Sequence, residues 1–367
     1  MVSISLLGAP TDVGASRLGC RLGPAALRVA GLQPALERFG CDVTDAGDVT
    51  GPPNPQGPRR HGYRNLHEVA FWVRAVHAAV RTELGEGRLP VLLGGDHSMS
   101  IGSVSAVAAH ARAAGRRLRV LWIDAHADFN TAALSPSGNI HGMPVACLTG
   151  HGPRELTSFD GADGPCVRPD EIREIGLRDV DPGEKAFLAE QGVEVFDMRY
   201  IDEFGMRATM ERALADLDVD APDGAGRADG REIYGGGTSG GGTHGSGGTH
   251  GNGGTHSSSS GTHGSVGADD AGGRETYGSG GTHLHVSLDL DVIDPDIAPG
   301  VGTPARGGAT YREIQLVMEM IADTGRLGSL DIMELNPAAD IRNETAELAV
   351  DLVESLFGKS TLVRPRR

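Results

Sequence analysis

The sequence predicts an α/β fold with a largely parallel sheet. Short apolar runs that end in polar or charged residues recur along the 367-residue chain, and amphipathic helical patterns separate several of them. The hydrophobic fraction of 39% is sufficient for a sizeable core, and the length suits one large domain or two ordinary ones. Because ligands bind at the carboxyl ends of the strands in such sheets, the charged strand ends indicate where a functional site lies.

The strands and helices can be assigned in chain order. A first strand over 3–10 is followed by a helix over 23–40, which has Pro24 near its start and Gly40 past its end, and by an amphipathic helix over 65–84. The remaining elements are strand candidates over 88–98, 116–128, 173–179, 193–198, 284–291 and 328–337, and a last helix over 344–358.

Composition excludes several classes of protein. A net charge of −16 disfavours a general binder of nucleic-acid backbones, which needs a basic face. No segment approaches the roughly 18 apolar residues of a membrane span, and the N-terminal MVSISLLGAP lacks the basic region and the apolar length of a signal peptide. The cysteines form no CxxC pair and are expected to be free thiols in a reducing compartment: Cys20, Cys41, Cys147 and Cys166. We therefore expect a cytoplasmic protein that binds neither nucleic acid nor membrane.

One segment differs in composition from the rest. Residues 219–282 are dominated by Gly, Thr, Ser and His, and a repeated GTH unit places His244, His250, His256 and His263. With almost no apolar side chains, the segment cannot offset the entropy of ordering, so we predict a disordered insertion between a helix ending near residue 218 and a strand beginning near Leu284. A passive loop is the simplest interpretation. The alternatives are a weak metal-buffering tract and an effect on assembly.

The stretch VLWIDAHADFN, over 120–130, carries the first chemical signal. Asp124, His126 and Asp128 occupy alternate positions directly after an apolar run. If this segment is extended, the three side chains point to one side. Carboxylates so close together repel each other, and a bound cation removes the conflict.

The same pattern recurs at two other strand ends. LDLDVIDP places Asp289 and Asp291 two residues apart, and LLGGDHS places His97 after a pair of glycines. Carboxylates with a minority of imidazoles and without thiolates suit Mn²⁺, with Zn²⁺, Co²⁺ and Fe²⁺ as alternatives. The number of candidate ligands exceeds what one metal usually needs, so two metals that share aspartates explain the set better.

These residues belong to motifs that resemble those of arginase, in the ureohydrolase family. GGDHS, DAHAD, SGNIHGMP, GLRDVDPGE, SLDLDVIDPDIAPGVGTP and DIMELNP occur in this order, and the resemblance covers nearly the whole chain outside the insertion. It implies one catalytic domain over 1–367 with the insertion inside it. The implied fold has three layers, with a central, mostly parallel sheet of about eight strands and helices on both faces.

The resemblance also implies an activity and a cofactor. The implied reaction is hydrolysis of L-arginine to L-ornithine and urea, in which a hydroxide bridging two Mn²⁺ ions attacks the guanidinium carbon. The resemblance implies that one manganese takes His97, Asp124, Asp128 and Asp289, and that the other takes Asp124, His126, Asp289 and Asp291. A homo-trimer or homo-hexamer is the implied assembly.

Roles for further residues follow from the same resemblance. Asp128 also accepts the proton of the attacking hydroxide, His141 shuttles a proton to the leaving amine, and Glu334 receives the guanidinium. Neutral hydrogen-bonding groups suited to the substrate's α-carboxylate are Asn130, Ser135, Ser137 and Asn139, of which the resemblance favours Asn130 and Ser137. The α-ammonium is implied to meet Asp181 and Glu184, directly or through water. Thr303 resembles a hydroxyl-bearing residue beside the site, and its alternative is a turn residue before Pro304.

Two other functions stay open from the sequence. Another ureohydrolase, such as an agmatinase or a guanidino-acid hydrolase, would share the metal site, but agmatine lacks the α-carboxylate and has less use for Asn130, Ser137, Asp181 and Glu184. A non-catalytic metal-binding protein is suggested by the His-rich segment. That function would not require His141 or Glu334.

Overall fold

The computed structural model describes residues 1–217 and 281–359. Its centre is an eight-stranded sheet in the order β2-β1-β3-β10-β9-β4-β7-β8, and all its neighbouring strands are parallel. The strands are β1 (Ser3–Gly8), β2 (Asp42–Asp48), β3 (Leu89–Leu93), β4 (Arg117–Ile123), β7 (Ile172–Ile175), β8 (Glu194–Phe196), β9 (Thr282–Asp289) and β10 (Leu327–Met333). A separate antiparallel pair joins β5 (Ser158–Phe159) to β6 (Ala162–Asp163).

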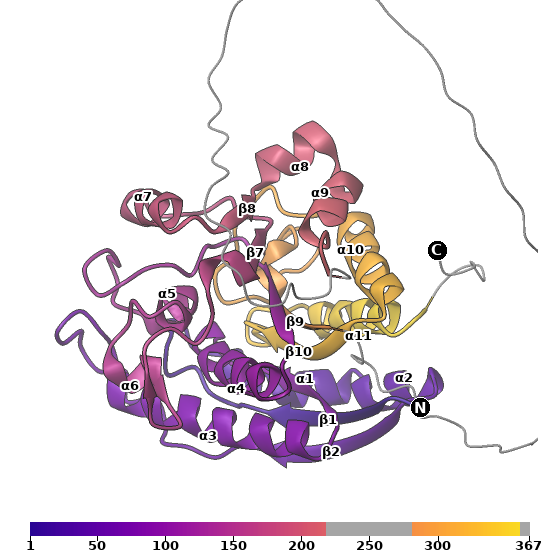
Figure 1. Cartoon of the computed structure of the whole chain (residues 1–367), viewed down its shortest axis with the longest axis horizontal. Helices are drawn as coiled ribbons and strands as arrows, with labels where there is room; N and C mark the ends of the chain where they lie inside the picture. Colours follow the sequence, from indigo (N-terminus) through magenta and orange to yellow (C-terminus); the bar gives the residue numbers. More distant parts are fainter. Residues whose placement is uncertain (218–280, 360–367) are drawn as a thin grey trace, which may run out of the picture. The chain divides into compact units, whose positions relative to one another are not determined.

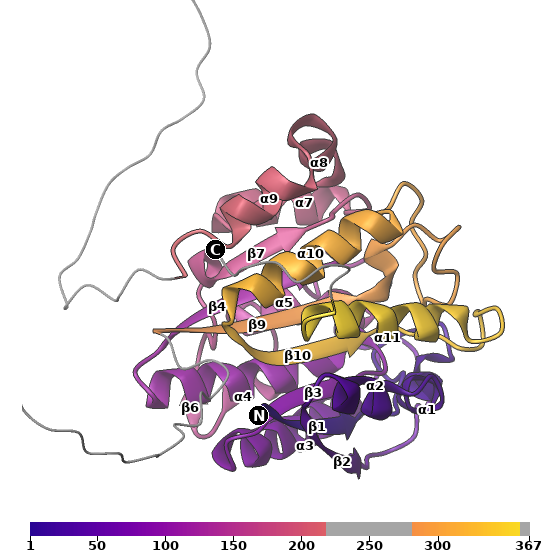
Figure 2. The same ribbon diagram turned by 90° about the vertical axis from the view of Figure 1, so that its right-hand side faces the viewer.

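Helices cover both faces of this sheet, which confirms the predicted three-layer α/β fold. One apolar core lies under α1 (Gly23–Val29), α2 (Leu32–Arg38), α8 (Met198–Phe204), α9 (Met206–Ala213), α10 (Tyr311–Thr324) and α11 (Glu344–Leu356). The other lies under α3 (Leu66–Gly85), α4 (Ser100–Ala113), α5 (Pro144–Leu148), α6 (Arg154–Thr157) and α7 (Pro182–Gln191). Figures 1 and 2 show α3 and α4 together on one side of the sheet and α10 and α11 on the other. Among the described residues, no helix combines the length and the hydrophobicity that a membrane span requires.

The burial of the central strands explains why their sequences contain recognisable strand patterns. Every residue of β3 is buried, as expected for a parallel strand covered on both faces, and such strands read as continuous apolar runs. β9 instead alternates, with Leu284 and Val286 in one core and His285 and Ser287 buried on the other face. That polar face leads along β9 to Asp289, at its carboxyl end.

One local prediction was wrong, and one strand was not predicted. The helix expected over 23–40 is divided into α1 and α2 at Gly31, whose φ of 85° lies in the left-handed region that glycine tolerates. The edge strand β2 was not predicted, because none of its side chains is fully buried and the segment has no apolar run.

The described ends of the predicted insertion lie side by side at the amino ends of β4 and β9. α9 ends at Ala213 rather than near residue 218, and β9 begins at Thr282, the last residue assigned to the insertion. The Thr282 hydroxyl donates to the Leu217 carbonyl at 3.0 Å, and the Arg117 N–H donates to the Gly281 carbonyl at 2.9 Å. The remaining residues of the insertion, including the four GTH histidines, lie outside the described residues.

Candidate metal centre and substrate pocket

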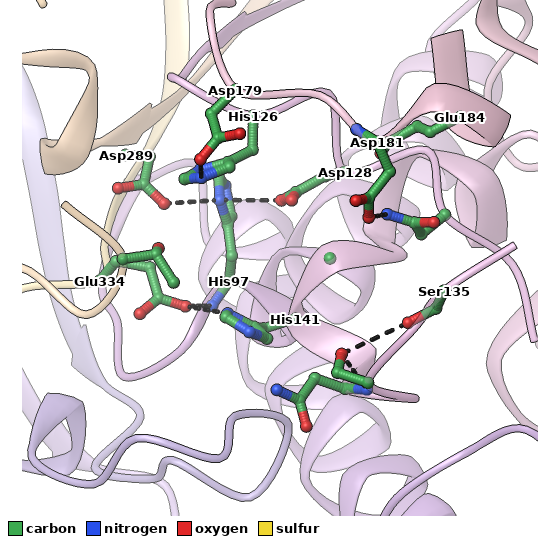
Figure 3. A pocket seen from close by; sticks show the side chains of 15 residues that line it. His97, His126, Asp128, Ser135, His141, Asp179, Asp181, Glu184, Asp289 and Glu334 are labelled. Carbon is green, nitrogen blue, oxygen red and sulfur yellow. Dashed lines mark hydrogen bonds and ion pairs between the residues drawn. The ribbon is translucent and has the colours of Figure 1, made fainter. Parts of the chain in front are cut away.

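A cavity of about 190 Å³ opens at the carboxyl ends of the central strands. Figure 3 shows side chains from several strand ends and loops converging on it. Its lining includes all the residues predicted from the sequence except Asp124 and Asp291, which are fully buried. The predicted residues that line it are His97, His126, Asp128, Asn130, Ser135, Ser137, Asn139, His141, Asp181, Glu184, Asp289, Thr303 and Glu334.

His97 stands at the centre of a first group of carboxylates. Its Nδ1 lies 3.1 Å from Asp124 Oδ2, 3.1 Å from Asp128 Oδ2 and 3.0 Å from Asp289 Oδ2. One ring nitrogen carries at most one hydrogen, so it cannot satisfy three carboxylates. His97 Nε2 is already within 2.9 Å of the Ser287 hydroxyl, which leaves Nδ1 facing the carboxylates.

A second group forms around His126 and shares Asp124 with the first. His126 Nδ1 lies 3.4 Å from Asp124 Oδ1 and 3.1 Å from Asp291 Oδ2. Asp124 therefore presents one oxygen to each imidazole. The two groups able to hold a metal ion are His97 with Asp124 and Asp289, and Asp124 with His126 and Asp291.

The chemistry of these groups fits a pair of divalent cations. Burial and then the neighbouring Asp124 raise the pKa of Asp128 well above its usual value, and burial followed by Asp291 does the same to Asp289. Within the described part of the chain, His97 Nδ1 and Asp128 Oδ2 are buried without a hydrogen-bond partner. Orphaned polar atoms that converge with like-charged carboxylates are what bound cations would satisfy.

The strand ends reach this arrangement by turns rather than by extended backbone. The Asp124 carboxylate accepts the His126 N–H at 2.7 Å, and the Asp289 carboxylate accepts the Asp291 N–H at 2.8 Å. β4 already ends at Ile123. The expectation that alternation in an extended segment aligns Asp124, His126 and Asp128 is therefore wrong, although these side chains do converge.

Two non-glycine residues at the site have left-handed backbone conformations. Asp128 has a φ of 51° and Glu334 a φ of 60°. Such conformations are strained for ordinary residues and occur where the surrounding structure holds them in place. In each case the unusual backbone directs a carboxylate into the pocket.

Glu334 and His141 form a hydrogen-bonded pair on one wall. Glu334 Oε1 lies 2.9 Å from His141 Nδ1 and accepts the backbone N–H of His97 at 2.9 Å. Burial alone lowers the pKa of His141, but the charge of Glu334 and the hydrogen bond to it raise the pKa above its ordinary value. The imidazole is thus favoured in its protonated form, as a proton donor.

The opposite rim carries the other predicted carboxylates. Asn130 Nδ2 donates to Asp181 Oδ2 at 3.1 Å. Both Glu184 oxygens accept backbone N–H groups, from Phe129 at 2.8 Å and from Asp181 at 3.2 Å, and burial raises the Glu184 pKa to about 7. Glu184 therefore holds the start of α7 against the pocket, while Asp181 is the more accessible of the two.

The hydroxyl-bearing residues occupy different positions. Ser135 accepts the Gly138 N–H at 2.9 Å, and Ser137 accepts the Asn139 N–H at 3.2 Å, so both serines shape the loop over 131–139. Thr303 donates its hydroxyl to Asp291 Oδ2 at 3.0 Å. Thr303 thus orients one carboxylate of the second metal group.

Sequence reasoning missed three contributors. Asp179 lines the pocket with its Oδ2 3.8 Å from His126 Nε2, and its place in GLRDVDPGE beside Asp181 was an available signal. Ser287, which contacts His97 Nε2, lies two residues before Asp289 on the same face of β9. Cys20 contacts Glu334 from a segment distant in sequence, and no local sequence pattern predicts this contact.

Comparisons with known proteins agree with this geometry. The model of the Arginase family matches residues 2–222 and 271–358. A protein of Bacillus caldovelox named arginase is 38% identical over 99% of this chain and 100% of that protein. The crystal structure of arginase from Bacillus cereus has a TM-score of 0.76 and 36% identity, and covers 99% of this chain and 100% of its own.

A second similar structure contains a bound amino acid. It is arginase from Entamoeba histolytica in complex with L-ornithine, with a TM-score of 0.73 and 26% identity over 98% of this chain and 100% of that one. The family match spans most of the chain on both sides of the predicted insertion, and the full-length relatives share one family name. This chain belongs to the arginase family.

Proposed function

We propose that this chain hydrolyses L-arginine to L-ornithine and urea. The observation that carries the proposal is one pocket that brings together two groups of side chains able to hold metal ions, a Glu334–His141 pair on one wall, and carboxylate and neutral hydrogen-bonding side chains on the opposite rim. In the view of Figure 3, Glu334 lies on one side of the pocket, and Asp181 and Ser135 lie on the other. A long substrate with a guanidinium at one end and an α-amino acid at the other matches this layout.

The metals are proposed to be two Mn²⁺ ions. We assign His97, Asp124, Asp128 and Asp289 to one ion, and Asp124, His126, Asp289 and Asp291 to the other, in agreement with the oxygen-rich donor set. When bound, the pair would supply a water molecule acidic enough to attack at neutral pH.

The side chains of the chain orient and protonate the substrate. The Glu334 carboxylate pairs with the guanidinium through hydrogen bonds and turns its carbon toward the metal-ligand groups. Asp128 accepts a proton released on attack, since it lines the pocket beside His97. His141 delivers a proton to the departing nitrogen, which leaves as the amine of L-ornithine.

The amino-acid end of the substrate selects L-arginine over agmatine. We assign Asn130, Ser135, Ser137 and Asn139 to the α-carboxylate, and Asp181 to the α-ammonium, with Glu184 acting through its hold on Asp181. The Entamoeba histolytica arginase complex holds L-ornithine, which bears the same α-groups as L-arginine. That likeness supports an α-amino acid as the substrate.

We also propose an assembly and a cellular compartment for this chain. A homo-trimer or homo-hexamer is expected from the family resemblance. A cytoplasmic location is supported by the cysteines, which are all free thiols in the structure.

Urea release by purified, manganese-loaded protein tests the function. L-arginine and agmatine are offered at equal concentration, with a chelated sample as control. Turnover of L-arginine that exceeds agmatine turnover and disappears on chelation is expected. A preference for agmatine would instead favour another ureohydrolase activity, and no turnover of any guanidino compound with two metals bound would favour a non-catalytic metal-binding protein.

A further inference from the structure

Two arginines outside the pocket hold the loop that faces the amino-acid end of the substrate. Arg59 donates from Nη2 to the Ala132 carbonyl at 2.8 Å and from Nη1 to the Pro136 carbonyl at 3.2 Å. Arg64 donates from Nε to the Ser137 carbonyl at 3.2 Å. These contacts run from a segment before α3 to the loop over 131–139, far apart in sequence.

The segment over 57–64, here called the arginine strap, is itself a closed turn. Arg60 and Tyr63 exchange backbone hydrogen bonds at 2.8 and 2.9 Å around His61 and Gly62, which both have positive φ, as a tight hairpin turn requires. Arg64 Nη1 donates back to the Gly57 carbonyl at 3.1 Å. The strap therefore has a defined shape that presents both guanidinium groups to the loop.

Close packing shows that the strap lies directly on the loop. A Cβ at Gly62 would meet the Ala132 Cβ at 2.5 Å, and one at Gly138 would meet the Arg59 side chain at 2.9 Å. The Arg64 N–H also donates to the Gly138 carbonyl at 2.8 Å. The carbonyls of Ala132, Pro136, Ser137 and Gly138 are thus satisfied by the strap rather than by regular secondary structure.

The charges on the two sides of the pocket differ accordingly. Asp179, Asp181 and Glu184 gather on one segment of the rim. The loop that carries Ser135 and Ser137 places neutral side chains in the pocket. Outside the pocket, its backbone carbonyls accept hydrogen bonds from the two guanidinium groups of the strap. A ligand with an ammonium and a carboxylate on one carbon fits this polarity, because each charge faces groups of the opposite sign or dipole.

We propose that Arg59 and Arg64 determine specificity for the substrate's α-carboxylate by positioning the loop over 131–139. They act through that loop and touch no reacting atom. The inference rests on the proposed function and deepens it: the preference for an α-amino acid over its decarboxylated analogue depends on the arginine strap, whereas the reaction at the guanidinium does not.

The test replaces each arginine by glutamine, singly and together, in the full metal-loaded chain. Each single variant is expected to raise the KM for L-arginine about fivefold to tenfold, as for the loss of a hydrogen bond from a charged donor. The kcat for L-arginine and the kcat/KM for agmatine are expected to stay within about twofold of the wild-type values, because the strap acts on the α-carboxylate end of the substrate and not on the guanidinium. Arg60→Gln, on the same strap, is the matched control, since Arg60 closes the turn through its backbone.

Arg59→Lys and Arg64→Lys separate charge from geometry. Lysine keeps the positive charge but loses the planar donor arrangement that lets Arg59 serve two carbonyls, so positioning predicts only partial recovery of the KM. Full recovery by lysine would make the charge, rather than loop position, the cause and would overturn the positioning role.

Calorimetric measurement of ligand binding tests the role of the arginine strap independently of turnover. L-ornithine retains the α-carboxylate and putrescine lacks it, so the variants should weaken L-ornithine binding severalfold and leave putrescine binding unchanged. Equal weakening of both ligands, or a lowered melting temperature with equal loss for L-arginine and agmatine, would reduce the strap to a structural role. Unchanged L-ornithine binding would overturn the proposed role of the strap in specificity for the α-carboxylate. Failure of wild-type protein to hydrolyse L-arginine would contradict the proposed function without deciding these binding comparisons.

Discussion

The Cys20 thiol lies 3.1 Å from Glu334 Oε2 and donates a hydrogen bond to it. Cys20 is fully buried, and burial followed by the charge of Glu334 raises its pKa well above the usual value, so the sulfur stays protonated as a donor. A Cβ at Gly302 would meet the same Oε2 at 2.5 Å. The carboxylate that we assign to the guanidinium is thus held by Cys20 at one oxygen and by the His97 N–H and His141 at the other.

Removing this thiol should weaken guanidinium binding. Cys20→Ala is expected to raise the KM for L-arginine by about threefold to tenfold with kcat nearly unchanged, because one weak donor to the carboxylate is lost. Cys20→Ser keeps a donor and should recover much of the loss. Steady-state kinetics with metal analysis and melting temperatures provide the measurement, and an unaltered KM in the alanine variant would contradict a role for Cys20 in holding Glu334.

Metal removal should destabilise the folded chain. Without cations, the buried carboxylates around His97 and His126 repel one another, and ligands that bind only the native state contribute about 3–4 kcal/mol at 100 to 1,000 times their Kd. Chelation is expected to lower the melting temperature, and Mn²⁺ to restore it. Asp124→Asn should lose both metals together because Asp124 faces both groups, whereas Asp291→Asn should retain more of the first metal. Metal analysis after dialysis checks this, and equal metal loss in the two variants would argue against a shared Asp124.

The buried carboxyl of Glu174 is expected to lower the free energy of unfolding as pH rises. It is fully buried on β7, neither of its oxygens has a partner among the described residues, and burial followed by the charge of Glu184 raises its pKa well above the ordinary 4.5. In the folded chain the carboxyl therefore stays protonated at pH values where the unfolded chain has released the proton. Stability from this group is full below the unfolded pKa and is lost as pH rises toward the folded pKa, by up to about 1.4 kcal/mol per pH unit.

Glu174→Gln removes this titration. The variant should match the wild type near pH 4.5 and become progressively more stable than it as pH rises to 8, measured by urea unfolding at several pH values. Glu190→Gln, at an exposed position on α7, is the control and should leave the pH profile unchanged. A constant difference between Glu174→Gln and the wild type at all pH values would exclude the proposed cause.

Deletion of residues 221–281 should preserve the catalytic fold. The Thr282 hydroxyl, which remains in the shortened chain, donates to the Leu217 carbonyl at the amino ends of the strands, whereas the pocket lies at the carboxyl ends, about 20 Å away along β4. We expect an unchanged melting temperature and unchanged arginine hydrolysis. Reduced metal stoichiometry at low free metal would support the metal-buffering alternative, and loss of folding would contradict the prediction of a passive insertion.

The sequence by itself determined the fold class, the family resemblance and the candidate ligands. Apolar runs that end in Asp and His predicted parallel strands with a site at their carboxyl ends, because buried strands and strand-end ligands leave contiguous patterns in the chain. The same patterns could not place β2, whose side chains pack too little to leave a signal. They also could not show that Asp128 reaches His97 through a positive φ rather than through strand alternation.

Only the tertiary structure decided which distant segments meet. Three contacts join residues whose own neighbours in sequence give no sign of the partner: Cys20 with Glu334, Arg59 with the loop over 131–139, and the Phe129 N–H with the Glu184 carboxylate. Local sequence encodes periodicity and turn preference, which act over a few residues. Hydrogen bonds between remote loops arise only once the sheet has brought those loops to one edge, so their partners become visible in the folded chain alone.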